Sequence, residues 1–462
     1  MSKPTVGYAN EGNGGGDTDG QERLVLLEEL GITQPNSDDM PTVEPTPEPK
    51  PKRKRGNLSN SPLARPDEAI HLLAQQVQNY LYFPEPDPLY VVLGCLAANM
   101  LKGNPVWLVL VGPPSSGRTI LLDTISDVDK VFVVGAFKGP GALLSGVAKK
   151  EVTKGATGGL LRQVGGHGML VMKDFTSMLS QQDGGESIAA LREIYDGKWS
   201  RPLGSDGGRV LEWNGKCGFL AASTPAIDRH SQMIGDLGER WVYYRYPNTD
   251  GYGETIRALG NKDPMAMMKE LRERVGAFVA GLSLEWNLEG GSDRRDLSKK
   301  EMNRLYSIAA ICTSIRSTVP RDTYTREVMD IAVKEGTARL GTVLGQIYLG
   351  LECIGLGESE RWRIVSKIGV DSAPQLRMAV VIAVRDAVGV GDKALTVSGL
   401  RRMLCCGQRA VRETVESLEL HGVLESIIDP SKSEKENEGA GIGWQLTDWA
   451  EKNWVQAFGK LY

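Results

Sequence analysis

A glycine-rich turn directly follows a short apolar run near residue 110. The run reads VWLVLV, and the residues Val111–Ile120 that continue it read VGPPSSGRTI. The phosphate-loop pattern G-x-x-x-x-G-K-[ST] is met at Gly112, Gly117 and Thr119, with Arg118 at the lysine position. In such a loop, backbone N–H groups and a helix N-terminus surround phosphate oxygens, while the Ser/Thr hydroxyl reaches Mg²⁺. The feature predicts strand, phosphate loop and helix in an α/β fold; the alternative is a structural turn.

The arginine at the lysine position favours nucleotide binding over nucleotide turnover. Arg118 keeps the positive charge, but a planar guanidinium does not simply replace a compact ammonium at a crowded β/γ-phosphate. We therefore expect ATP and Mg²⁺ to bind more readily than ATP is hydrolysed. The residues expected around the nucleotide are Gly112, Pro113, Ser115, Ser116, Gly117, Arg118, Thr119 and Ile120, with the Thr119 hydroxyl at the metal.

Composition narrows the class of protein. The 462 residues suffice for two or three domains, and 41% apolar with 24% charged residues indicates a mostly globular chain. A net charge of −4 means that nucleic-acid contacts must come from local patches. There is no apolar stretch of transmembrane length, no secretory leader pattern, and no C-x-x-C pair among six cysteines. We expect a cytoplasmic protein with neither a membrane partner nor a structural zinc.

Changes in composition along the chain predict four parts. Residues 1–60 are low in complexity and predict a disordered arm. Within it, Glu22–Leu30 is a transient helix or a partner-docking segment, and the basic residues 50–55 are a phosphate-binding arm or a solvated linker. The other parts are a core at 61–260 in which strands alternate with helices, a helical lid at 261–357, and a C-terminal domain at 358–462. Such alternation implies a mostly parallel sheet with its ligand at the carboxyl ends of the strands.

Polar residues follow the predicted strands of the core. Asp174 follows strand Met169–Met172, where a carboxylate would hold Mg²⁺ through water. Thr224 follows strand Gly218–Ala222, either to sense a γ-phosphate or as an ordinary turn. Arg240 precedes the strand at 241–244, either as an arginine finger for a neighbouring subunit's nucleotide or in a surface salt bridge. The residue after Asp174 is phenylalanine, and none of the stand-in bases, Asp183, Glu186 and Glu193, is compelling.

Two further elements carry positive charge. A predicted hairpin, with strands at 198–202 and 209–213, bears Lys198, Arg201 and Arg209 and would either hold a nucleic-acid backbone in a ring pore or be a plain exposed hairpin. The C-terminal order of three helices, strand, polar loop and strand predicts a winged helix. There Gln408, Arg409 and Arg412 begin the third helix, the end that enters a major groove. An acidic wing loop supports the alternative of a protein contact.

These pieces, in this order, resemble an AAA+ ATPase. A hairpin before the strand that ends at Thr224 is similar to the pre-sensor-1-insert branch, which includes the minichromosome-maintenance helicases, and a C-terminal winged helix resembles them too. Across roughly residues 68–425, the chain is most similar to an AAA+ family of phages and integrative mobile elements of bacteria. The stretches that carry this resemblance are VWLVLVGPPSSGRT, LVMKDFTSMLS, LREIYDGKWSRPLGSDGG, STPAIDRH and GERWVYYR.

The resemblance assigns roles to single residues. Gly112, Gly117 and Thr119 match the phosphate loop, Asp174 the Walker B carboxylate and Thr224 sensor 1. Arg240 matches the arginine finger, and Arg339, in the stretch EGTAR, matches the sensor-2 contact to nucleotide. The departures are Arg118, which puts the rate of turnover in question, and Phe175, which leaves the catalytic base unassigned.

Three functional hypotheses follow. The first is an ATPase that assembles as a ring, a hexamer by the resemblance, and moves single-stranded DNA during replication of a phage or mobile element in a bacterial cell, together with replication proteins. The second is an ATP-gated DNA-binding or loader platform with negligible hydrolysis. The third is a transcription regulator whose winged helix binds a specific duplex.

Overall fold

The computed structural model describes residues 65–137, 139–146, 158–181, 184–203, 210–236, 238–247, 251–286, 291–389, 395–427 and 443–459. All of them belong to one compact unit, Ser59–Tyr462. The predicted disordered arm, the segment Glu22–Leu30 and the basic run at 50–55 lie outside these residues.

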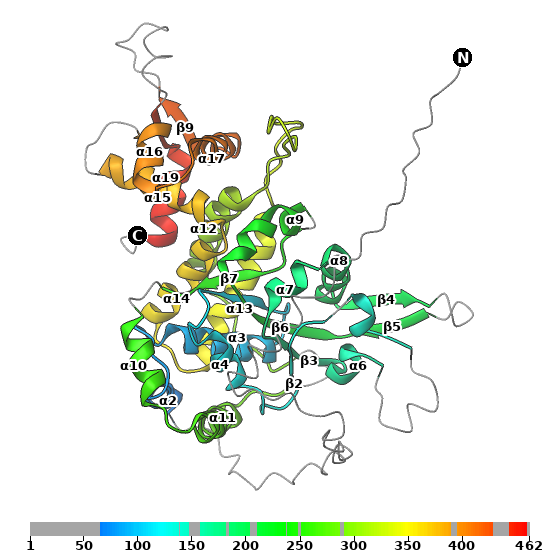
Figure 1. Ribbon diagram of the computed structural model, residues 1–462. Helices are drawn as coiled ribbons and strands as arrows, with labels where there is room; N and C mark the ends of the chain where they lie inside the picture. Colours follow the sequence, from blue (N-terminus) through cyan, green and yellow to red (C-terminus); the bar gives the residue numbers. More distant parts are fainter. Residues whose placement is uncertain are drawn as a thin grey trace, which may run out of the picture. The chain divides into compact units, whose positions relative to one another are not determined.

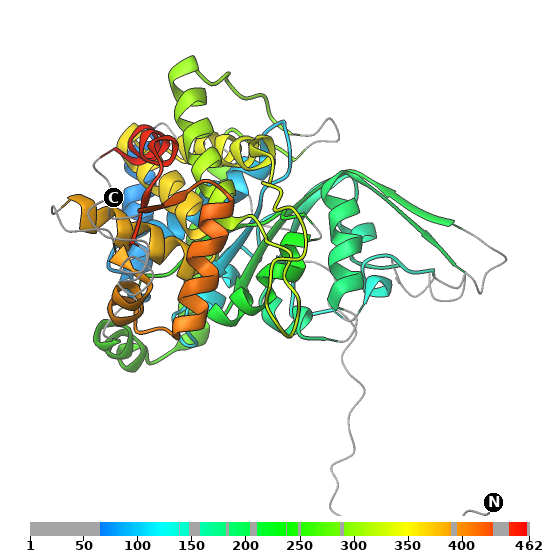
Figure 2. The same ribbon diagram turned by 90° about the horizontal axis from the view of Figure 1, so that it is seen from above.

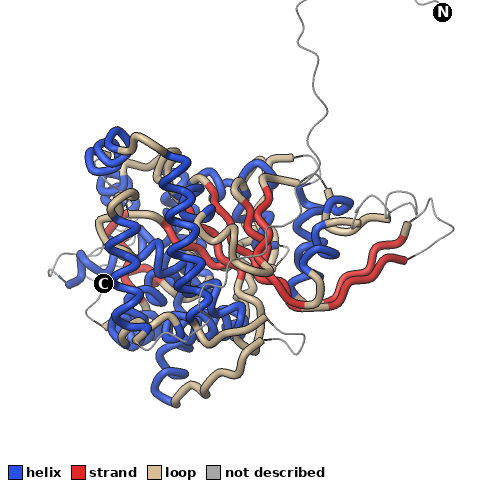
Figure 3. The backbone as a smooth tube through the Cα atoms, turned by 90° about the horizontal axis from the view of Figure 1, so that it is seen from below, coloured by secondary structure: helices blue, strands red, loops and turns tan. Residues whose placement is uncertain are grey.

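A five-stranded parallel sheet forms the centre of the described part (Figures 1 and 3). Its strand order is β2-β3-β6-β1-β7, and every neighbouring pair is parallel. β1 is buried at each of its five residues, because strands on both sides and packed helices cover it. The α/β class and the parallel sheet are therefore confirmed. Its strands are β1 (Trp107–Val111), β2 (Val131–Val134), β3 (His167–Met172), β6 (Lys216–Ser223) and β7 (Val242–Arg245).

Helix α3 (Asp87–Met100) is buried along its whole length. It contacts β3 and β6 of the sheet, and its most extensive contact is with α13 (Thr337–Cys353). The two helices approach closely because glycines face each other: a Cβ on Gly350 would lie 2.3 Å from the carbonyl oxygen of Gly94. Helices of the predicted lid are thus packed into the same core as the sheet, and the division at 260 and 357 stays a prediction.

Three elements of the C-terminal part were not predicted from the sequence. The helix α14 (Glu358–Asp371) packs against β7, and β8 (Leu395–Thr396) joins a small antiparallel sheet with β10 (Gly443–Leu446) and β9 (Leu424–Ile427). The last helix, α19 (Asp448–Phe458), packs against α12 (Lys299–Arg316). The other helices are α2 (Pro66–Gln78), α4 (Arg118–Asp123), η1 (Pro140–Ala142), α6 (Leu160–Val164), α7 (Phe175–Leu179), α8 (Gly184–Tyr195), η2 (Pro225–His230), α9 (Ser231–Asp236), α10 (Tyr252–Gly260), α11 (Pro264–Gly281), α15 (Gln375–Gly389), α16 (Val397–Leu404) and α17 (Gln408–Leu420).

An antiparallel hairpin of β4 (Lys198–Pro202) and β5 (Val210–Asn214) extends beyond α8 (Figure 2). Its tip, with Arg209, lies outside the described residues. The C-terminal helices and strands come in the order expected for a winged helix, but the wing loop also lies outside them, and the winged-helix assignment stays a prediction. Searched through its described ranges, the chain contains no helix with the length and apolarity needed to cross a membrane.

Candidate nucleotide site at the carboxyl edge of the sheet

The loop between β1 and α4 has the backbone that its glycine pattern predicts. Gly117 immediately precedes α4 and has a φ of +74°, and Ser115 is also left-handed, with a φ of +67°. A left-handed position is adopted at little cost by glycine and seldom by serine. The loop is therefore a tight turn that ends at a helix N-terminus, where backbone N–H groups are available to an anion. Thr119 lies exposed in the first turn of that helix.

Arg118 closes over its own loop. Its Nε donates to the Ser116 hydroxyl at 3.0 Å, and a terminal nitrogen donates to the carbonyl oxygen of Pro113 at 3.0 Å. The residue is only 9% exposed. Burial lowers its pKa, and the nearby Tyr246 and Asp174 oppose that shift. The guanidinium would have to leave these partners to contact a phosphate. The Asp174 carboxylate lies close enough to the Arg118 guanidinium for the two charges to interact.

An apolar wall beside the loop was missing from the sequence-based site. Leu81 lies against Gly117, since its methyl carbon is 3.9 Å from where a Cβ would be. Tyr246 follows β7, packs against Gly112 and meets the Phe83 ring edge-on at 6.1 Å. Its hydroxyl is buried, and no group among the described residues bonds it. Tyr246 directly follows a strand that ends at the carboxyl edge. This position in the sequence could have marked it as a residue of the site.

Asp174 and Thr224 follow neighbouring strands at this same edge. Asp174 caps α7: its carboxylate accepts from the Ser177 backbone N–H at 3.0 Å and from the Ser177 hydroxyl. The Thr224 N–H donates to the Thr176 hydroxyl at 3.1 Å, and that hydroxyl lies 2.7 Å from the hydroxyl of Ser223. Because β6 lies between β1 and β3, this group of hydroxyls stands between the loop and Asp174.

The edge suits a Mg²⁺ nucleotide. Mg²⁺ keeps several waters and takes one or two protein oxygens together with the substrate's phosphates. The Thr119 hydroxyl and the Asp174 carboxylate are such oxygens, and the described residues contain no denser cluster of acidic, histidine or cysteine side chains that would hold a metal alone. The turn backbone and the helix N-terminus fit a phosphate.

Arg240 and Arg339 lie at the opposite edge, where β7 begins. Arg240 is 7% exposed, donates to the Gly238 carbonyl at 2.9 Å and pairs with Asp196 at 3.2 Å. Arg339 donates to the carbonyl oxygen of Glu239 at 3.1 Å. The structure therefore brings the two arginines together but separates them from their own chain's loop by the length of β7. Contact with a nucleotide stays a prediction for both, and for Arg240 it requires release from Asp196.

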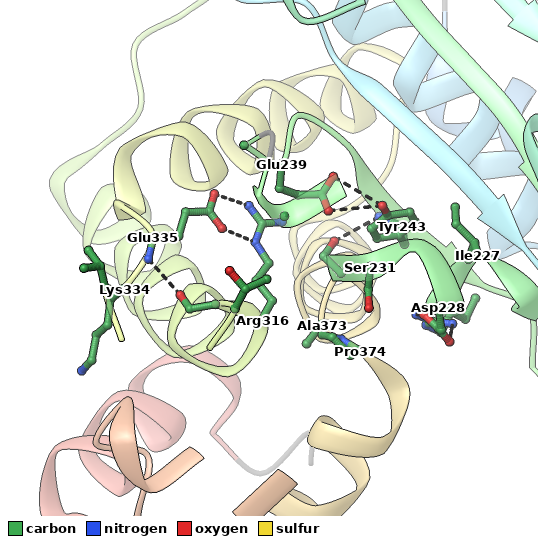
Figure 4. A pocket seen from close by; sticks show the side chains of 17 residues that line it. Ile227, Asp228, Ser231, Glu239, Tyr243, Arg316, Lys334, Glu335, Ala373 and Pro374 are labelled. Atoms are coloured by element: carbon green, nitrogen blue, oxygen red, sulfur yellow. Dashed lines mark hydrogen bonds and ion pairs between the residues drawn. The ribbon is translucent and has the colours of Figure 1, made fainter. Parts of the chain in front are cut away.

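A cavity of about 190 Å³ is lined by residues that include Glu239, Arg316 and Glu335 (Figure 4). Arg316 forms a paired ion bridge with Glu335 at 2.6 and 2.7 Å, and the carboxylate of Glu239 accepts from the Trp241 N–H and the Tyr243 hydroxyl. Burial raises the pKa of Glu239 to about 7. No sequence pattern marked this cluster, because its members come from segments that are distant in the chain.

In the described part of the hairpin, the two basic residues lie on opposite faces. Lys198 is exposed, on the same face as Glu212 and Asn214. Arg201 lies on the other face with Trp199, and its guanidinium donates to the carbonyl oxygen of Leu144 at 2.7 Å. Strand alternation therefore turns Arg201 away from the face that carries Lys198, and nucleic-acid binding by the hairpin stays a prediction.

The start of α17 is exposed but contacted by another segment. Gln408, Arg409 and Arg412 are all exposed, as expected of a recognition helix. Arg409, however, pairs with Glu413 at 2.9 Å and donates to the Tyr324 carbonyl. The segment before α13 therefore lies beside the surface that a DNA groove would cover, and duplex binding stays a prediction.

The chain was compared with known proteins. It matches no family model and no curated protein. Among solved structures it is similar to the A form apo structure of the NrS-1 C-terminal region, at 11% identity and a TM-score of 0.29, over 55% of this chain. The match spans 56% of that chain, about half of its length.

Proposed function

We propose that this protein is a P-loop ATPase of the AAA+ class that assembles on DNA. The observation that carries the proposal is the meeting of the Gly112–Thr119 loop, Thr224 and Asp174 at one edge of a parallel sheet. Ligands of open α/β sheets bind at this edge. β6 lies between the loop strand and the Asp174 strand, and so places Thr224 between the two.

We assign each residue of this edge a role that its position supports. Backbone N–H groups of the loop and of the first turn of α4 would bind phosphates, and Leu81, Phe83 and Tyr246 would bound the rest of the nucleotide. Thr119 and Asp174 would hold Mg²⁺, which supplies positive charge against the phosphates when bound. The Thr176, Ser223 and Thr224 hydroxyls would orient a water molecule. The residue after Asp174 is Phe175, which is fully buried. This position therefore supplies no carboxylate that could accept a proton.

Slow turnover is the second candidate, and the bonds of Arg118 favour it. A guanidinium held by Pro113 and Ser116 contributes to phosphate binding only after those hydrogen bonds break. Loss of a charge-assisted hydrogen bond costs about 1.5–3 kcal/mol, or roughly 10–100-fold in rate. An ATP-gated platform would then keep assembly without rapid hydrolysis. DNA remains the proposed partner through Lys198, Arg209 and α17.

The test is ATP hydrolysis by the full chain with and without single-stranded DNA. Asp174→Asn is the matched variant, because asparagine still caps α7 while the carboxylate charge is lost. We expect an unchanged melting temperature and at least a ~100-fold loss of turnover. Stimulation by DNA supports the motor. ATP binding without turnover supports the platform, provided that Arg118→Lys restores turnover. Turnover that survives Asp174→Asn contradicts the site.

A further inference from the structure

A second cavity, of about 300 Å³, lies between the starts of α12 and α14. Three of its seven lining residues are basic: Lys300, Arg304 and Arg361. Its volume is at the lower end of the range of about 300–1,000 Å³ that is usual for pockets that hold small molecules. None of its lining residues belongs to the Gly112–Thr119 loop or follows a strand of the parallel sheet. The cavity is therefore separate from the candidate nucleotide site.

Two aromatic rings hold the arginines of this cavity in position. The Arg304 guanidinium lies over the Trp362 ring, 4.4 Å from its centroid, and the Arg361 guanidinium lies over the Tyr348 ring at 4.5 Å. The two rings pack against each other, with centroids 4.4 Å apart. A guanidinium on an aromatic face is attracted by the ring, and its planar fork of donors then points in a fixed direction. Both positive groups are therefore positioned before any ligand arrives.

Arg304 has no counter-ion within ion-pair distance. Its Nε donates to the carbonyl oxygen of Ala457 at 2.9 Å, and among the described residues no carboxylate pairs with it. Burial lowers its pKa, and the more distant Tyr348 and Glu358 oppose that shift. A half-buried cation without a partner is costly, so an anion that entered the cavity would relieve this cost.

The other two basic residues also keep donors for a ligand. Lys300, the second residue of α12, is exposed and forms no ion pair within the described ranges. Arg361 gives one terminal nitrogen to Glu352, and its Nε is buried without a hydrogen-bond partner in the described part of the chain. Lys299 and Lys300 stand in the first turn of α12, where the helix dipole disfavours positive charge. An anion beside this turn would offset that repulsion.

Two carboxylates also line the cavity, and both have partners. Glu301 accepts from the Arg295 guanidinium at 2.8 and 3.0 Å and from the Ser298 N–H at 2.7 Å. Arg295 lowers the pKa of Glu301 to about 2, so Glu301 stays ionised and paired. The Glu358 carboxylate accepts from the Trp362 indole N–H at 3.3 Å.

The charges of the wall sum to a positive value. Four of the charged groups form a neutral network of ion pairs, namely Arg295, Arg361, Glu301 and Glu352. Lys300 and Arg304 are then opposed by Glu358 alone. These two lie four residues apart, on the same face of α12. A planar guanidinium matches the oxygens of a phosphate, and a compact ammonium adds charge beside it.

We propose that the cavity between α12 and α14 binds a phosphate group, carried either by a small phosphorylated molecule or by a nucleic-acid backbone. Arg304 and the free nitrogens of Arg361 would donate to the phosphate oxygens from the aromatic stack, and Lys300 would contact them from the first turn of α12. The proposal does not rest on the proposed ATPase activity, because the cavity shares no residue with the carboxyl edge of the sheet.

The experiment is affinity labelling of the full chain with pyridoxal 5′-phosphate. Its aldehyde condenses with a lysine amine and releases water, cyanoborohydride reduces the imine, and peptide mass spectrometry locates the label. We expect Lys300 to be labelled at least ~10-fold faster than Lys262, the effect of one charge-assisted hydrogen bond. Lys262 is the matched control, since it is also exposed and forms no ion pair within the described ranges. Pyridoxal, which lacks the phosphate, should label both lysines at similar rates. The Gly112–Thr119 loop contains no lysine, so phosphate bound there leaves no label.

Competition in the wild type identifies the source of the phosphate. Protection of Lys300 by inorganic pyrophosphate, but not by a single-stranded oligonucleotide, supports a small phosphorylated molecule. Protection by the oligonucleotide that weakens as salt rises supports a nucleic-acid backbone. Protection by neither compound overturns the proposal, and this arm needs no variant that could fail to fold.

The variant Arg304→Gln tests whether the arginine directs the probe. It keeps Lys300 in place, and we expect labelling of Lys300 to fall to the rate of Lys262. Its melting temperature, compared with that of the wild type, shows whether the fold is kept. Three further results would overturn the proposal: equal labelling of the two lysines in the wild type, the same preference with pyridoxal, or a preference that survives in folded Arg304→Gln.

Discussion

Glu239 is a half-buried carboxyl group that pairs with no basic side chain among the described residues. Its carboxylate accepts from Trp241 and Tyr243, while the nearby Arg316 is bridged to Glu335. Burial raises its pKa from 4.5 to about 7. The folded protein therefore holds a proton that the unfolded chain loses between those values, and the free energy of unfolding should fall as pH rises from about 4.5 to about 7.

The substitution Glu239→Gln should flatten this part of the pH dependence. Glutamine keeps an acceptor for Trp241 and Tyr243 but does not ionise. Between pH 5 and pH 8, we expect the wild type to lose roughly 1–3 kcal/mol more than the variant. Denaturant unfolding at both pH values measures it, with Glu212→Gln, at an exposed hairpin position, as control. A variant whose pH dependence matches that of the wild type would refute the assignment.

At the scale of elements, the contact between α3 and α13 should tolerate no side chain at its crossing. A methyl group on Gly350 would lie 2.3 Å from the Gly94 oxygen and 2.7 Å from the Ala98 nitrogen. Gly350→Ala should therefore lower the free energy of unfolding by about 1–3 kcal/mol through overpacking. Gly276→Ala, in α11 with nothing within 4 Å, should raise it by roughly 0.5–1 kcal/mol. Equal effects at the two positions would show that the helices are not so closely packed.

Elements with a strong periodic or glycine signal could be predicted, and those defined by partners could not. β1 and its loop follow from VWLVLVGPPSSGRT, because an apolar run and two glycines act locally. β8 has two residues and exists only through pairing with β10. The hydrogen bond of Arg201 to the Leu144 carbonyl could not be predicted either, because sequence shows the charge but not which segment lies beside the strand.

At the scale of the molecule, strand order decides which predicted residues meet. The loop, Asp174 and Thr224 were predicted as neighbours because carboxyl ends of parallel strands share an edge. Leu81, Phe83 and Tyr246 were missed, since they come from segments whose proximity depends on tertiary packing. Arg240 and Arg339 lie together at the other edge, so contact of either with a nucleotide stays a prediction.

The most direct measurement is calorimetric binding of ATP with Mg²⁺ to the wild type, Gly117→Ala and Gly165→Ala. Both glycines have φ values near +70°, so alanine should cost each protein about 1–2 kcal/mol of stability. Only Gly117 lies in the Gly112–Thr119 loop, where the proposed site would bring the backbone close to the ligand. The account predicts binding at least ~10-fold weaker in Gly117→Ala and unchanged in Gly165→Ala. No binding by the wild type, or equal binding by both variants, would contradict a nucleotide site at this edge.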